Sequence, residues 1–125
     1  MGTFSYSISL GDPAAERWVD VEALVDTGAT YTMVPASLLR DLGIVPHTSR
    51  QFLLADGRAI EWQMGRSWVR LGDQQEITLF IFGDEGTSVL LGAYTLEAFG
   101  LSVDTVDQRL VPVPGLLMPL ASNGG

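Results

Sequence analysis

The segment ALVDTGATYTMVP, residues 23–35, places one charged side chain between two apolar runs. Residues 23–25 end a run typical of a buried strand, and Gly28 lets the chain turn sharply two residues after Asp26. A carboxylate at such a turn is partly shielded from water, so it needs hydrogen-bond donors, which the Thr27 hydroxyl and the turn amides can supply. This environment is compatible with a reactive carboxylate, but an Asp that only caps the turn would have the same neighbours in the sequence.

Composition bounds the class of protein. The chain has 125 residues, of which 46% are hydrophobic and 18% charged, so we expect one folded domain with a modest core. Cysteine is absent, which excludes disulfides, thiol nucleophiles and thiolate metal sites. The net charge is −8 and the seven basic residues are scattered, which argues against nucleic acid and anionic membranes as partners. There is no long apolar run and no basic, apolar leader, so we expect a cytoplasmic protein.

Short runs of alternating polarity, separated by 14 glycines and six prolines, indicate a β-rich chain. The dipeptide Asp56-Gly57 between two apolar runs is typical of a tight hairpin. Strands are expected at residues 4–10, 18–25, 31–34, 50–55, 58–64, 68–71, 76–82, 88–91, 101–106 and 109–113.

Two short helices are expected, because a proline early in a helix and a glycine just past its end are the usual boundaries. The first extends from Pro35 to Gly43, and the second covers about residues 94–99, before Gly100. Each follows an apolar strand and a glycine turn, which indicates a duplicated motif. We assign residues 1–113 to one domain and expect residues 114–125 to form a flexible tail.

A family resemblance rests on three motifs in a fixed order. They are LVDTGAT at residues 24–30, the Asp56-Gly57 hairpin, and VLLGA at residues 89–93 before a short helix. Together they resemble the retropepsin-like aspartic peptidases, the one-domain, homodimeric relatives of pepsin found in retroviruses and bacteria. The resemblance covers residues 19–113. It implies a mostly β, retropepsin-like acid-protease barrel with one or two short helices and one lobe per chain.

The resemblance also implies roles for individual residues. Asp26 matches the catalytic aspartate, Thr27 the threonine that reaches across the dimer axis, and Gly28 the backbone beside them. The positions expected to contact substrate are those of the cleft and of a mobile flap tip: Leu24, Ala29, Met33 and Leu90 in the cleft, and Ala55, Asp56 and Gly57 in the flap.

Three features depart from the retroviral pattern. Thr30 stands where many retroviral members have an aspartate, Ala93 stands where an arginine usually follows the glycine, and Gly57 is the only flap-tip glycine. Catalysis is compatible with these changes, but substrate preference and dimer contacts do not transfer.

A single Asp-Thr-Gly implies two chains. Peptide hydrolysis by aspartates needs an acid and a base together, which two nearby carboxylates provide by sharing one proton. The only similar string, SVDTVD at residues 102–107, has Val106 where glycine is required, and we interpret it as a hairpin arm. A working site therefore requires a homodimer with both Asp26 residues on its two-fold axis. Such a dimer would also explain a buried carboxylate.

The predicted function is an aspartic endopeptidase that cuts extended peptides and uses no cofactor and no metal. His47 is the only histidine, so a histidine-based triad cannot be built in one chain. Trp62, just beyond the flap hairpin, is expected to pack in the core or to brace the hairpin. Two alternatives stay open: a catalytically silent module for dimerisation or peptide binding, and a glycosidase, which needs two different carboxylates in one cleft.

Overall fold

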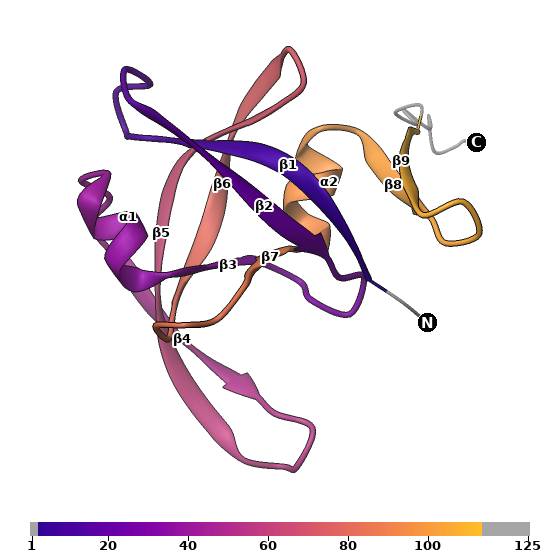
Figure 1. Ribbon diagram of the computed structural model, residues 1–125. Coiled ribbons are helices and arrows are strands. Elements are labelled where there is room, and N and C mark those ends of the chain that lie inside the picture. Colours follow the sequence, from indigo (N-terminus) through magenta and orange to yellow (C-terminus); the bar gives the residue numbers. More distant parts are fainter. Residues whose placement is uncertain (1–2, 114–125) are drawn as a thin grey trace, which may run out of the picture.

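The computed structural model describes residues 3–113, which form nine strands and two short helices (Figure 1). The predicted tail, residues 114–125, lies outside the described residues. The elements are, in chain order, β1 (Phe4–Gly11), β2 (Trp18–Val25), β3 (Thr32–Pro35), α1 (Ala36–Asp41), β4 (Thr48–Leu53), β5 (Ala59–Leu71), β6 (Gln74–Gly83), β7 (Val89–Leu91), α2 (Ala93–Ala98), β8 (Leu101–Asp104) and β9 (Arg109–Pro112).

The main sheet closes into a barrel. Its strand order is β1-β2-β7-β3-β6-β5-β4, and β1 also pairs with β5, so six strands form a ring and β4 is attached to the outside of β5. The β4–β5 hairpin therefore projects from the barrel, and β8 and β9 form a separate two-stranded sheet beside α2 (Figure 1). The predicted mostly β barrel with two short helices is confirmed.

The core fills the inside of this ring because polar and apolar residues alternate along the strands. Leu10, Val34 and Phe80 are fully buried, and Leu39 of α1 and Leu96 of α2 close the core from outside the sheet. Burial of each such side chain contributes roughly 1.5–3 kcal/mol to folding. Neither helix in residues 3–113 has the length and apolar character needed to cross a membrane.

The helix boundaries follow the predicted proline and glycine signals. Pro35 is the residue before α1, and Gly43 just after it has a φ of 76°. Gly100 follows α2 with a φ of 67°. Glycine adopts such a left-handed backbone without strain, so both helices end where the sequence places a glycine.

Several predicted strand ends differ from the structure by one or two residues, as in β3 and β6, and three further differences have a clear physical cause. Residues 58–64 and 68–71 are not two strands, because β6 pairs with β5 without interruption from Met64 to Leu71. The Asp56-Gly57 turn is longer than two residues: the strands end at Leu53 and resume at Ala59, and the Gly57 amide donates to the Leu54 carbonyl. Gly57, at a φ of 88°, takes the left-handed position of a longer hairpin loop.

The third correction concerns β8, which ends at Asp104 rather than at residue 106. The Asp104 carboxylate accepts hydrogen bonds from the amides of Val106 and Asp107, at 3.0 and 3.2 Å. A side chain that satisfies backbone amides in this way replaces the ladder bonds of a strand and starts a turn.

Three buried threonines join α2 to the barrel. The Thr95 hydroxyl of α2 lies 2.6 Å from the Thr32 hydroxyl of β3 and 2.9 Å from the Thr78 hydroxyl of β6. The Thr32 oxygen also accepts the amide of Gly92, at 3.1 Å. Because all three hydroxyls are buried, each depends on the others for its hydrogen bonds.

Replacing Thr95 with valine tests this network. Thr95→Val keeps the shape of the side chain but leaves the Thr32 and Thr78 hydroxyls without their shared partner. We expect the free energy of unfolding to fall by about 1–3 kcal/mol. Thr48→Val, at an exposed strand position, should change it by less than about 0.5 kcal/mol. Urea unfolding at one fixed protein concentration measures both, and equal stabilities of the two variants would contradict a structural role for the network.

Candidate active site

The Asp-Thr-Gly loop begins where β2 ends. The Asp26 carboxylate accepts the Gly28 amide at 2.9 Å, and the Ala29 amide donates to the Asp26 carbonyl at 3.1 Å. The donor to the carboxylate is thus a turn amide and not the Thr27 hydroxyl. Asp26 is half-buried, while Thr27 and Gly28 are exposed, so a single chain does not bury this carboxylate.

The second half of the predicted repeat holds this loop in place. The amide of Asp26 donates to the Leu91 carbonyl of β7 at 3.2 Å. At the other end of the loop, the loop carbonyls accept: the amides of Ala93 and Tyr94 donate to the carbonyls of Ala29 and Thr30, at 2.9 and 2.8 Å. Bonds at both ends of the loop fix the backbone on which Asp26 sits.

Gly92 makes this arrangement possible. A Cβ atom at Gly92 would lie 2.5 Å from the carbonyl carbon of Tyr31, closer than any side chain permits. Glycine is therefore required by the approach of two backbones, and the LLGA string is explained by contact with the loop after Asp-Thr-Gly.

A cavity of about 250 Å³ lies between the loop and the β4–β5 hairpin. Among the residues expected to contact substrate, it is lined by Ala29, Met33 and Leu90, together with Gly28 of the tripeptide. The other four expected residues do not line it. One is Leu24, which pairs with Leu90 in the sheet, and the other three are Ala55, Asp56 and Gly57 at the tip of the hairpin.

Three aromatic side chains, Tyr31, Phe52 and Trp62, also line this cavity, and the sequence did not predict a substrate contact for any of them. Phe52 lies between two neighbours: its ring centroid is 6.1 Å from that of Tyr31 and 5.6 Å from that of Trp62. Trp62 thus packs on the hairpin, as expected of a brace. The available signal was the strand alternation, which places Phe52 and Trp62 on the same face of the hairpin.

The hairpin tip carries its own ion pair. The Asp56 carboxylate accepts the Arg58 amide at 3.0 Å and the Arg58 Nε at 2.7 Å, and these bonds hold the pKa of Asp56 below its usual value. Because the pKa of Asp56 is lower in the folded than in the unfolded chain, the stabilisation that the ionised Asp56 gains from Arg58 is complete above the unfolded pKa. It is lost only as the pH falls through the lower folded value. The tip contacts therefore persist into acidic solution.

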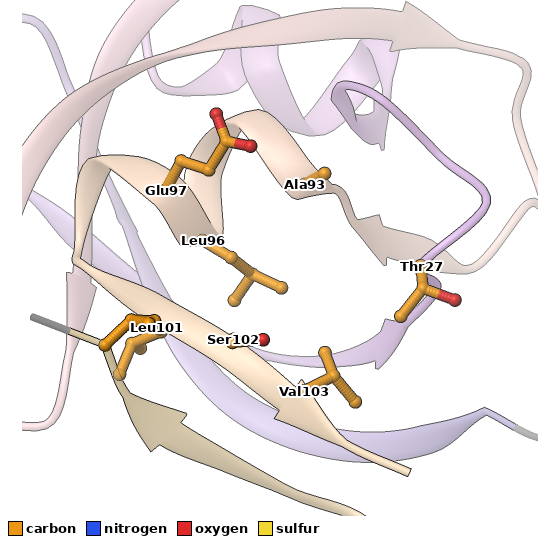
Figure 2. Close-up of a pocket in the computed structure, with 8 residues that line it drawn as sticks. Thr27, Ala93, Leu96, Glu97, Leu101, Ser102 and Val103 are labelled. Atoms are coloured by element: carbon orange, nitrogen blue, oxygen red, sulfur yellow. The ribbon is translucent and has the colours of Figure 1, made fainter. Parts of the chain in front are cut away.

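A second cavity, of about 310 Å³, lies on the other side of the loop between α2 and β8. Thr27 stands at one end of it, Leu96 forms part of the α2 wall, and Ser102 and Val103 come from β8 (Figure 2). The Asp-Thr-Gly loop thus separates two hollows, one beneath the hairpin and one beside β8.

One carboxylate limits what this site can do alone. A single Asp26 can act as an acid or as a base, but concerted acid and base catalysis needs a second titratable group. Within residues 3–113, no group of three or more His, Cys, Asp or Glu side chains is placed to hold a metal ion.

Comparison with solved structures finds the same fold in three proteases or protease-like domains. The retropepsin-like aspartic protease of Rickettsia conorii is 23% identical, with a TM-score of 0.54 over 88% of this chain and 90% of that one. Simian foamy virus protease is 15% identical, with a TM-score of 0.54 over 75% and 92% of the two chains. The retroviral protease-like domain of Ddi1 from Leishmania major is 18% identical, with a TM-score of 0.53 over 92% and 96%.

Sequence comparison gives the family directly. No curated protein sequence matches the chain. The family described as "gag-polyprotein putative aspartyl protease" matches residues 18–98, which is more than half of the chain and includes the Asp-Thr-Gly loop, the hairpin and α2. The chain therefore belongs to this gag-type aspartyl protease family.

Proposed function

We propose that this protein is a homodimeric aspartic endopeptidase in which the two Asp26 carboxylates of a dimer activate a water molecule. The observation that carries the proposal is the position of Asp26. It is half-exposed on a loop that backbone hydrogen bonds hold at both ends, and its neighbours Thr27 and Gly28 line two different cavities. Membership of the family supports the same reading.

The chemistry requires the two carboxylates to share one proton, because both cannot ionise easily at close range. The ionised carboxylate takes a proton from the water, and the resulting hydroxide attacks the carbonyl carbon of the scissile bond. The protonated carboxylate donates its proton to the carbonyl oxygen. Collapse of the tetrahedral intermediate then breaks the C–N bond, and the amine leaves with a proton returned from the pair.

The proposed substrate is an extended peptide between the loop and the β4–β5 hairpin, which would act as a flap. Met33, Leu90 and Phe52 make the cavity beneath the hairpin apolar, so apolar side chains next to the cut bond are favoured. The proposed contacts to Leu24 and to the tip residues, Ala55, Asp56 and Gly57, would arise when the flap and the partner subunit close over the peptide.

The proposed dimer surface is the hollow between α2 and β8 together with the β8–β9 hairpin. This hairpin pairs with no other strand among residues 3–113, so its edges are open to strand pairing. Val106 is 88% exposed and Val113 47% exposed in and after this hairpin, so both are available for contact with a second copy. Thr27 faces this hollow one residue from Asp26, so a second copy docked here would bring the two loops together.

Asp26→Asn tests the catalytic proposal. Asparagine can still accept the Gly28 amide, so we expect the fold and the dimer to persist, whereas peptide cleavage should fall by at least roughly 10²–10⁴-fold with both proton-transfer groups removed. Asp73→Asn, at an exposed turn position, is the matched control and should cleave like wild type. Mass spectrometry of a digested peptide library, from acidic to neutral pH, measures cleavage. A dimeric wild type that cuts nothing would favour the silent binding module instead.

Ser102→Arg tests the dimer surface. The exposed Ser102 side chain lies in the hollow beside β8, so arginine there should block a second copy without disturbing the core. We expect a folded monomer without peptidase activity. Gln74→Arg adds the same charge at the exposed first residue of β6 and should stay dimeric and active. Sedimentation velocity reports the mass of each variant, and a dimeric, active Ser102→Arg would place the interface elsewhere.

A further inference from the structure

One cationic side chain contacts Tyr31, a residue that lines the cavity beneath the β4–β5 hairpin. In β4, Arg50 and Phe52 are two residues apart and so lie on the same face, and Arg50 is directly opposite Trp62 in the register with β5. The Arg50 Nη1 donates to the Tyr31 hydroxyl at 2.6 Å, and its guanidinium carbon is 5.5 Å from the centre of the Tyr31 ring. This contact places the guanidinium against Tyr31, which is one of the residues that line the cavity.

Two aromatic neighbours hold the Tyr31 ring in place. Its ring centroid lies 5.6 Å from that of Tyr94 on α2 and 6.1 Å from that of Phe52 on β4. A planar guanidinium that is hydrogen-bonded to such a fixed ring loses little further freedom when it binds an anion. Tyr31 therefore serves as a positioning residue for Arg50.

Most of the hydrogen-bonding capacity of Arg50 is unused in the free chain. A guanidinium has five N–H donors, and the side-chain bonds found within residues 3–113 use one of those on Arg50, toward a neutral hydroxyl. The ion pairs in this part of the chain involve Arg58 and Arg109, not Arg50. In a protein of net charge −8, this guanidinium supplies positive charge beside Tyr31, a residue that lines the cavity, and so favours an anion there.

We propose that Arg50 forms an acidic-residue subsite, which selects a glutamate side chain of the peptide substrate. The methylenes of glutamate would lie against the apolar cavity wall formed by Phe52 and Trp62, while its carboxylate accepts hydrogen bonds from the guanidinium. This inference rests on the proposed peptidase function, and it names a substrate feature that the net charge of the protein would disfavour.

The test compares matched peptides that carry glutamate, glutamine or lysine. An extended peptide with an apolar pair at the cut bond is prepared with each residue in turn at every flanking position. We expect kcat/KM to favour glutamate by about two- to fivefold at two positions, one on each side of the cut bond, because the dimer carries two Arg50 residues; this is the range of an ion pair that stays partly exposed. Arg50→Gln should abolish this preference, Arg50→Glu should convert it to a preference for lysine, and Arg66→Gln, which removes a charge elsewhere on β5, should leave it unchanged.

Two further measurements separate recognition from folding. In wild-type protein the ratio of glutamate to glutamine cleavage should fall as salt is raised, because an exposed ion pair is screened. Tyr31→Phe keeps the ring but removes the hydroxyl that holds Arg50, so it should lower the ratio of kcat/KM for the glutamate peptide to kcat/KM for the glutamine peptide. A preference that survives in Arg50→Gln, or no preference in wild type, would overturn the proposal.

Binding to the inactive variant distinguishes this inference from the peptidase proposal. Asp26→Asn protein, titrated with the same fluorescently labelled peptides, should bind the glutamate form about two- to fivefold more tightly. If the wild type cleaves peptides but neither assay distinguishes glutamate from glutamine, only the subsite fails. If binding distinguishes them but wild type cuts none, the subsite stands and the catalytic proposal fails.

Discussion

The close approach of Gly92 to the backbone of Tyr31 is the constraint on which the rest of this structure depends. It lets β7 lie against the loop that carries Asp26, so that the amides of Ala93 and Tyr94 reach that loop. The same approach brings the Gly92 amide to the buried Thr32 hydroxyl and thereby couples the loop to α2. A larger residue at this position would separate the two halves of the motif, and the carboxylate would lose the support that fixes it.

That support positions a carboxylate but does not complete a catalytic site. Asp26 has one ordered donor, the Gly28 amide, and stays half-exposed between two hollows. Tyr31, Phe52 and Trp62 are among the residues that line the hollow beneath the β4–β5 hairpin, and the hollow beside β8 adjoins a hairpin that pairs with no other strand of residues 3–113. A peptide in the first and a second chain in the second would give the lone carboxylate the substrate and the partner that its chemistry requires.

Much of this could be predicted from local sequence, because the signals were local. Alternating strands, the glycines at helix ends and the Asp-Thr-Gly turn each depend on neighbouring residues, and they were found. The incorrect predictions concern hydrogen bonds to residues that the local alternation of polarity does not reveal. β5 runs on past Gly65 because β6 pairs with it, and β8 stops early because the Asp104 carboxylate captures amides beyond it. The threonine network and the aromatic walls join strands far apart in sequence, so alternation identifies their faces but not their partners.

The claim that two copies of Asp26 form one site is tested most directly by subunit mixing. Wild-type and Asp26→Asn chains are combined in equal amounts at constant total concentration, and native mass spectrometry of tagged chains verifies random exchange. If each site needs both carboxylates, only dimers of two wild-type chains are active, and activity should fall to about a quarter of that of wild type alone. A fall to only about a half would mean that each chain works with its own Asp26, and it would contradict this account.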